Sequence, residues 1–388
     1  MRTSRATDLT TWLASRLPHS AIILTFLSMN AVAQAPSERG LGPGRALTSQ
    51  DFIQIAGVRE LLDGGLLVTD AIENRLYYID PRGGSTVLGR SGDGPNEFRA
   101  VGPLAALARD STFMLDPGSS RWIIIAGSQI VASIPATSGL PREFRTRLLG
   151  ADSLGNVLAW GGIAFSGTRR LDILADTIVF ILANRQGTAR DTIGRGVGRG
   201  SAGVISIPPR NDRPGFLNLS NPLASEDQAL LFPDGWVAVA RVTPYRVDWR
   251  APDGRWVEGQ RLPPPVMPIT PALRCTAIAR WAEVDSSCDS SLYPAWPQRV
   301  PPFLPAGSQA GRPILIGASG GRLVIARTPE IQGNSLRHPY DIVDRSGALI
   351  SRLNLEGTAV VVGTGRTGLY VVHRDPDGLQ QLRLHAWP

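Results

Sequence analysis

The amino-acid sequence predicts an all-β protein built from repeated short strands. Glycine and proline are abundant, at 42 and 31 of 388 residues, which is typical of many strands joined by turns. Outside the N-terminal region, no long segment places apolar residues at helical spacing. Turn signals also recur at a regular interval. Hydrophobic residues make up 43% of the chain and charged residues 19%, so the repeats can share a large core.

The stretch from Leu62 to Phe98 shows the repeated unit most clearly. Glycine and aspartate in its turns tolerate positive φ or bond to nearby backbone groups. The expected order is turn, strand, polar loop, strand, turn and strand, at 63–65, 66–69, 70–74, 76–79, 81–84 and 86–88. Later stretches repeat this plan with variations, so the unit is a meander of short strands.

The spacing of the turns predicts the architecture. Turns after each unit's first strand fall at 63–65, 110–111, 152–155, 233–235, 319–321 and 364–368. Where no insertion intervenes, the interval is roughly 45 residues, the period of four-stranded propeller blades. Turns that precede an outermost strand number five, one fewer than the six turns above. The last unit therefore lacks its outermost strand, and the segment from Arg45 to Ser49 can supply it. We therefore expect a six-bladed β-propeller whose sixth blade is closed by the N-terminal strand.

The N-terminal residues 1–35 have the features of an export signal. Arg2, Arg5 and Arg16 precede a short apolar run at 21–27, and small residues at 31–35 offer a cleavage site. The apolar run is far shorter than the ~20 residues that span a bilayer. We expect residues 36–388 to form the mature propeller, periplasmic or extracellular, with no membrane span after cleavage.

One inter-blade sequence resembles a known group of proteins. The stretch Gly89-Arg-Ser-Gly-Asp-Gly-Pro-Asn-Glu-Phe98 is similar to the G-x-x-G-x-G-P-G-E-F signature of secreted bacterial six-bladed propellers of the NHL and TolB-like kind, with Asn96 at a usual glycine. Tyr340 to Gly347 resembles their final blades. The resemblance covers most of Asp51 to Pro388 and is weak in the middle. It implies the fold, export and a binding role, and it supplies no catalytic residues.

The signature also has a structural interpretation. Glu97 can accept backbone N–H groups across the turn, and Phe98 can pack between adjacent blades. A phosphate site is disfavoured because neither a helix nor a lysine adjoins the glycines. Two aspartate–arginine pairs at one shared spacing are expected to brace their loops: Asp70 with Arg75, and Asp116 with Arg121.

The long segments between strands should all emerge on one face of the propeller, where loops can carry a binding site. The longest, a proline-rich cap at about 262–312, contains Cys275 and Cys288, which are expected to form a disulfide in an exported protein. Its aromatic residues either pack on the blades or line a pocket. The candidate ligand-binding residues are Arg90, Asp93, Glu97, Arg145, Trp281 and Trp296.

Charge and site chemistry favour a binding or scaffolding module over an enzyme. The net charge is +7, and all 40 basic residues are arginines, which indicates a solvated surface or an anionic partner. We expect a monomer that binds an unknown protein or small-molecule ligand, with no metal and no cofactor.

Two other functions are alternatives. A metal-dependent lactonase or lyase needs acids or histidines on the inner strands, and only Glu60 and Asp227 lie at inner-strand ends. Nucleic-acid binding is suggested by the pI of about 10.2, but export argues against it.

Overall fold

The computed structural model describes the part of the chain that forms the sheets. The described residues are 38–94, 96–119, 121–135, 147–162, 177–184, 190–200, 204–207, 217–221, 223–265, 267–271, 273–275, 298–304, 313–332 and 335–388. Four named positions lie outside them, together with the predicted signal at 1–35: Arg145, Trp281, Cys288 and Trp296. None of the helices within the described part is long and apolar enough to cross a membrane.

The first two sheets are antiparallel meanders. The first contains β3 (Ile55–Glu60), β4 (Leu66–Asp70), β5 (Arg75–Ile79) and β6 (Ser85–Ser91), and β7 (Glu97–Phe98) runs parallel to β6. The second contains β8 (Leu104–Ala106), β9 (Ser111–Asp116), β10 (Arg121–Ala126) and β11 (Gln129–Pro135). The predicted strands and turns of this region are confirmed.

The middle of the chain forms one eight-stranded sheet. Its first half contains β12 (Arg147–Ala151), β13 (Asn156–Gly162), β14 (Thr177–Asn184) and β15 (Arg190–Val197). Its second half contains β18 (Gln228–Leu231), β19 (Val237–Arg241), β20 (Arg246–Arg250) and β21 (Trp256–Val257). The halves meet in a parallel bridge between Gly150 and Leu231. A separate hairpin lies between them in sequence, formed by β16 (Val204–Ile207) and β17 (Leu217–Ser220).

The last two sheets both include a short N-terminal strand. One contains β22 (Leu315–Ala318), β23 (Arg322–Ala326), β25 (Ser335–Val343) and β26 (Leu349–Glu356), with β24 (Glu330–Gln332) on β25 and β1 (Glu38–Arg39) on β26. The other contains β27 (Val360–Thr364), β28 (Gly368–Arg374), β29 (Gln380–Ala386) and β2 (Arg45–Ala46). The expected pairing of the segment from Arg45 with the last strand is therefore present.

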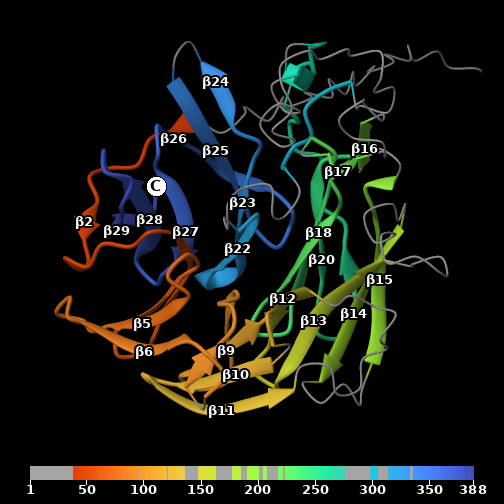
Figure 1. The fold of residues 1–388 in the computed structure, drawn as a ribbon. Helices are drawn as coiled ribbons and strands as arrows, with labels where there is room; N and C mark the ends of the chain where they lie inside the picture. The colour runs from red at the N-terminus through yellow and green to blue at the C-terminus, as the bar shows by residue number, and fades with distance from the viewer. Residues whose placement is uncertain are drawn as a thin grey trace, which may run out of the picture. The chain divides into compact units, whose positions relative to one another are not determined.

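The sheets have a β-propeller-like arrangement. Figure 1 shows the last sheet, the first and the second following one another around a common centre. The first strands contact one another in cyclic order: β3, β8, β12, β18, β22, β27 and again β3. Counted as continuous sheets, the described residues form four separate sheets of this kind and one curled eight-stranded sheet, in place of six separate blades.

The hydrophobic core lies between neighbouring sheets. Leu67 and Leu76 of the first sheet pack with Met114 and Ile123 of the second. Corresponding clusters lie between the last and first sheets and between the last two sheets. The largest fully buried side chain, Trp249, contributes to the cluster between the second half of the eight-stranded sheet and the next sheet. Each sheet therefore buries both faces against its neighbours.

Strand direction separates two rims. Because strands alternate in direction within a meander, first-to-second and third-to-fourth turns lie at one end of each sheet. These turns have at most five residues, as at 61–65, and they define the short-turn rim. The other end, the long-loop rim, carries the ends of the long connections at 92–103, 136–146, 163–176, 198–227, 258–314 and 327–334. The parallel bridge at Gly150 shows that β12 and β18 present the same rim.

Replacement of Gly150 by alanine should disrupt the junction within the eight-stranded sheet. Gly150 has φ +130°, and a Cβ there would collide with the backbone oxygen of Leu231. We expect Gly150→Ala to lower the free energy of unfolding by about 3 kcal/mol in urea titration. Gly155→Ala is the matched control, because Gly155 also has positive φ but has open space around it. The control should cost about 1 kcal/mol; equal losses would contradict this explanation.

Candidate functional site

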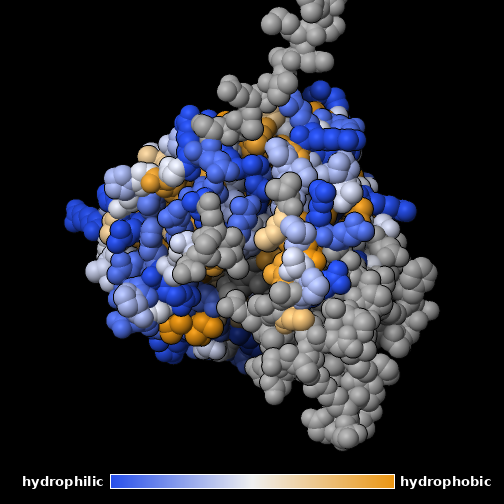
Figure 2. Space-filling view, turned by 90° about the horizontal axis from the view of Figure 1, so that it is seen from above, coloured by the Kyte–Doolittle hydropathy of each residue, from blue (hydrophilic) through white to orange (hydrophobic). Residues whose placement is uncertain are grey.

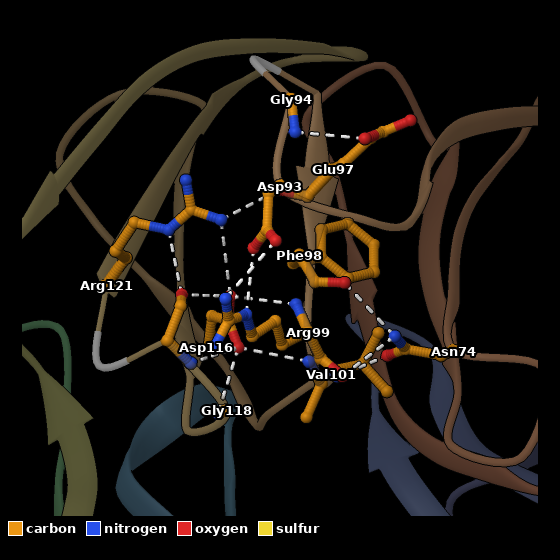
Figure 3. Close-up of polar contacts among 12 residues, drawn as sticks. Asn74, Asp93, Gly94, Glu97, Phe98, Arg99, Val101, Asp116, Gly118 and Arg121 are labelled. Atoms are coloured by element: carbon orange, nitrogen blue, oxygen red, sulfur yellow. Dashed lines mark hydrogen bonds and ion pairs between the residues drawn. The ribbon is translucent and has the colours of Figure 1, made fainter.

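The glycine-rich loop after β6 is a tight turn with its own hydrogen bonds (Figure 3). The Gly92 N–H donates to the carbonyl of Phe98 at 3.2 Å, and the Glu97 N–H donates to the carbonyl of Gly94 at 3.1 Å. The Glu97 carboxylate accepts the Gly94 N–H at 2.9 Å, as predicted. This bond and a weaker one from Arg90 lower the pKa of Glu97. Glu97 therefore holds its own turn as a carboxylate.

Phe98 anchors this loop in the core. Its side chain is fully buried among residues of the first and second sheets. A Cβ on Gly89 would lie 2.7 Å from the Phe98 ring, so glycine is required for this close approach. The prediction that Phe98 packs between neighbouring sheets is confirmed.

Asn74 clamps the end of the loop from the side. Its amide donates to the carbonyls of Phe98 at 3.1 Å and Arg99 at 3.0 Å. Its side-chain oxygen accepts the Val101 N–H at 2.8 Å. Asn74 has φ +53°, a conformation that asparagine tolerates better than most residues. Sequence reasoning missed this role, although an asparagine closing a polar turn was a usable signal.

Asp116 is the buried acceptor at the centre of the site. Its side chain has no exposed surface and accepts the Ser119 hydroxyl. It also accepts four backbone N–H groups at 3.0–3.2 Å, those of Arg99, Ala100, Gly118 and Ser119. Burial alone would raise the pKa of Asp116, but these hydrogen bonds outweigh it and the pKa is lowered. Arg121 lies 3.6 Å away, which confirms the predicted ion pair.

Asp70 repeats the Asp116 arrangement in the first sheet. It accepts backbone N–H groups from Ile53, Gln54, Ile72 and Glu73 at 2.7–3.3 Å. These donors stand at the same sequence offsets as the four donors to Asp116. The predicted ion pair with Arg75 is wrong, because Arg75 contacts Glu73 at 3.5 Å and the Tyr77 hydroxyl at 3.4 Å. Asp70 braces two loops through their backbones.

The outward side of the loop carries exposed charges. Arg90, Asp93 and Arg99 have side-chain exposures of 74%, 68% and 60%. Arg99 makes two hydrogen bonds to Asp93, at 2.8 and 3.2 Å, which lower the pKa of Asp93. The structure thus brings together three predicted candidates, Arg90, Asp93 and Glu97. The other three, Arg145, Trp281 and Trp296, lie outside the described residues.

The described ends of the cap rest on the same rim. The Leu262 N–H donates to the carbonyl of Tyr245 at 2.8 Å. Thr328 donates from its hydroxyl to Pro301 at 2.6 Å and from its N–H to Pro302 at 3.0 Å. Tyr245 and Thr328 belong to second-to-third strand connections, as Asn74 does in the first sheet. The base of the cap and the glycine-rich loop therefore share the long-loop rim.

A buried charge cluster fixes the base of the cap. The Tyr245 hydroxyl donates to Asp341 at 2.8 Å, and Arg352 donates to the same carboxylate at 2.7 Å. Arg327 lies 3.7 Å from Asp341, which is completely buried. Burial, followed by the Asp341 charge, raises the pKa of Tyr245 well above its ordinary value. Tyr245 therefore remains a neutral donor that links two sheets beneath the cap.

The acids predicted near the channel are used as structural acceptors. Glu60 accepts the N–H of Arg366 at 2.8 Å and its guanidinium at 2.9 Å. Asp227 accepts the N–H groups of Val197 and Val242 and the Arg241 guanidinium, at 2.9–3.0 Å. Within the described ranges, no three His, Cys, Asp or Glu residues are grouped so that they could hold a metal ion.

Part of the charge in the 194–227 segment is paired and buried. Arg199 forms an ion pair with Glu226 at 3.0 Å. Their side-chain exposures are only 12% and 4%. The start and end of this long connection are therefore fixed to each other.

Comparison with known proteins gives weak similarity to solved structures. No family model and no curated protein matches the chain. A solved DUF4221-family member from Bacteroides vulgatus has 10% identity and a TM-score of 0.46, over 90% of this chain and 96% of that one. A protein of Bacteroides fragilis, described as a putative exported protein, has 10% identity and a TM-score of 0.45, over 91% of this chain and 96% of that one. The calcium-binding protein regucalcin from Agrobacterium tumefaciens has 12% identity and a TM-score of 0.43, over 90% of this chain and 96% of that one. These values assign no function.

Replacement of Asp116 by asparagine should destabilise the loop and the fold. The amide would present N–H groups to several donors, so we expect a loss of about 3 kcal/mol in unfolding free energy at neutral pH. Because the pKa of Asp116 is lowered, its stabilisation is complete above about pH 4 and is lost as the pH falls through the lowered pKa. The exposed control Asp93→Asn should leave the urea midpoint unchanged. A midpoint shift as large as that of Asp116→Asn would refute the buried brace.

Removal of the Tyr245 hydroxyl should loosen the base of the cap. Tyr245→Phe leaves the buried Asp341 with one donor fewer, at an expected cost of about 2 kcal/mol. Tyr78→Phe is the matched control, because the Tyr78 hydroxyl donates to Asp63 at an exposed site, at 2.9 Å. Limited proteolysis should cleave the 258–314 segment faster in Tyr245→Phe than in Tyr78→Phe. Identical cleavage rates would show that the cluster does not hold the cap.

Proposed function

We propose that this protein is an exported β-propeller that acts as a binding or scaffolding module. Its partner, a protein or a small-molecule ligand, binds on the long-loop rim. The observation that carries this proposal is the one-sided placement of the long connections. The glycine-rich loop and the base of the cap, both held by buried carboxylates, support it because a rigid frame positions loops for binding.

The proposal includes a count of six blades. The two halves of the eight-stranded sheet are each a complete four-stranded meander, and one parallel bridge joins them. Their first strands also occupy successive places in the cycle of first-strand contacts. These features support treating the halves as two blades whose inner strands touch.

Export and the cap belong to the same proposal. Residues 1–35 act as a cleaved signal, and the mature chain is a monomer in the periplasm or outside the cell. In that compartment, a disulfide between Cys275 and Cys288 staples the cap and adds about 3 kcal/mol by closing a short loop. The cap covers part of the rim, and its aromatic residues contact the ligand or the blades.

The surface chemistry favours a polar or anionic partner. Figure 2 shows one face on which hydrophilic residues predominate and hydrophobic residues occur in small separate areas. Arg90 is exposed on the glycine-rich loop and makes only a long contact with Glu97, at 3.4 Å, whereas Arg99 is also exposed but pairs with Asp93. Guanidinium groups bind carboxylates and phosphates in bidentate fashion.

The experiment compares equal charge changes on the two rims. Arg90→Glu/Arg99→Glu alters the long-loop rim, and Arg82→Glu/Arg255→Glu alters exposed positions on the short-turn rim. Immobilised protein is incubated with envelope extract, and bound proteins and small molecules are quantified by mass spectrometry. We expect wild type and the short-turn variant to retain the same species, and the long-loop variant to lose about tenfold in affinity, equivalent to ~1.4 kcal/mol.

Two results would contradict the proposed function. Equal retention by both variants would remove the long-loop rim from binding. Loss in the short-turn variant alone would place the site on the opposite rim. Circular dichroism and urea midpoints for all three proteins separate a binding loss from an unfolded variant.

A further inference from the structure

Arg327 is a buried cation at the base of the cap. It directly follows β23 and begins the 327–334 connection on the long-loop rim. Only 5% of its side chain is exposed, and its Nε atom is fully enclosed without a hydrogen bond. Among the described residues, its guanidinium group approaches two carboxylates, at 3.7 Å and 4.0 Å. Both distances are too long for hydrogen bonds, so this buried charge has no bonded partner there.

The nearer carboxylate, that of Asp341, is already used by other donors. Its Oδ2 atom accepts the Tyr245 hydroxyl at 2.8 Å, and its two oxygens accept Arg352 at 2.7 and 3.4 Å. The Nε atom of Arg327 lies 3.7 Å from Oδ2 and makes no hydrogen bond to it. Two guanidinium groups therefore face one buried carboxylate, which leaves an excess of positive charge on Arg327.

The second carboxylate, that of Glu330, lies on the outer side of Arg327. Its Oε1 atom is 4.0 Å from Nη2 of Arg327, and its side chain is 44% exposed. An ion pair this long and this exposed contributes little. The position of Glu330 also shows that the Nη2 side of the guanidinium group opens toward solvent. A group of the size of a carboxylate can therefore approach Arg327 from that side.

The surroundings of Arg327 offer few competing polar groups. The adjacent Thr328 has both its N–H and its hydroxyl bonded to the carbonyls of the 301–302 segment. Phe303 has no exposed surface and packs against the Tyr245 ring, at 6.3 Å between centroids. An unpaired charge is costly in such a place, and the attraction of an anion to it is weakly screened. An incoming anion therefore gains more from Arg327 than from a fully exposed arginine.

We infer that Arg327 is the binding site for an oxyanion, the carboxylate or phosphate group of a ligand that docks at the base of the cap. The planar guanidinium group offers parallel N–H donors to two oxygens of such a group. Glu330 is the resident carboxylate that the ligand displaces. This inference rests on the proposed function, because it names the ligand class of the long-loop rim.

Thermal unfolding of the full chain in three sodium salts tests the site. Phosphate and acetate supply the two oxyanions, and chloride at equal ionic strength is the control. For a dissociation constant on the order of 5 mM, about 50 mM oxyanion should raise the Tm by about 2 °C over chloride. A rise with only one oxyanion would support the site and identify the group that it takes. Equal Tm values in all three salts would overturn the inference.

Arg327→Gln is the informative variant. It removes the positive charge and the guanidinium fork, so the rise specific to the site should disappear. General effects of phosphate and acetate on the protein surface persist in both proteins and are removed by the comparison. The same rise in wild type and Arg327→Gln would show that the oxyanions act elsewhere, against the inference.

Glu330→Gln covers the case in which Arg327→Gln fails to fold, because Glu330 is exposed. Removal of the competing charge, 4.0 Å from Arg327, should tighten oxyanion binding about threefold. The matched control is Glu356→Gln, because Glu356 pairs with Arg337 on the same sheet, at 3.4 Å, and the variant removes the same charge. This control should bind like wild type. Equal tightening in both variants would reduce the effect to net charge and would refute a local site.

The proposed function and this inference fail in different ways. If oxyanions do not bind at Arg327 but Arg90→Glu/Arg99→Glu loses its partner, only the oxyanion site is wrong. If Arg327 binds oxyanions but the variants of the two rims retain the same species equally, the oxyanion site stands and the proposed partner surface is wrong.

Discussion

Buried carboxylates that accept backbone N–H groups are the interaction on which the long-loop rim depends. Asp70 and Asp116 each end the second strand of a sheet and bind two N–H groups before the first strand and two after the second. Burial of a charge is costly unless its hydrogen bonds are satisfied, and here they are. Hydrogen bonds to an ionised acceptor are also about twice as strong as neutral ones. Each aspartate thus fixes two loops at once.

This bracing explains how an irregular rim can remain ordered beside short strands. Phe98 secures the glycine-rich loop from within the core, and Asn74 secures it from the neighbouring turn. On β25, the buried Asp341 likewise fixes the base of the cap, because it accepts the Tyr245 hydroxyl. Because these loops are already ordered, less conformational entropy is lost when a ligand binds.

The sequence allowed prediction of the strands, because turn residues and apolar runs are local signals. It also allowed prediction of the Arg45 pairing, and of the roles of Glu97 and Phe98. The Asp70–Arg75 ion pair was wrong because spacing alone cannot tell whether a carboxylate meets a guanidinium or backbone N–H groups. The Tyr245–Asp341 bond joins residues far apart in the chain, so no local pattern contains it.

In the middle of the chain, a buried carboxylate again links two loops, but the residues that make the link differ. In the second half of the eight-stranded sheet, Asp227 comes directly before the first strand, β18, and Arg241 ends the second strand, β19. Asp227 accepts the Val242 N–H after that strand and the Arg241 guanidinium. The same two loops are therefore tied with donor and acceptor positions exchanged. Either arrangement can therefore tie a loop before the first strand to a loop after the second.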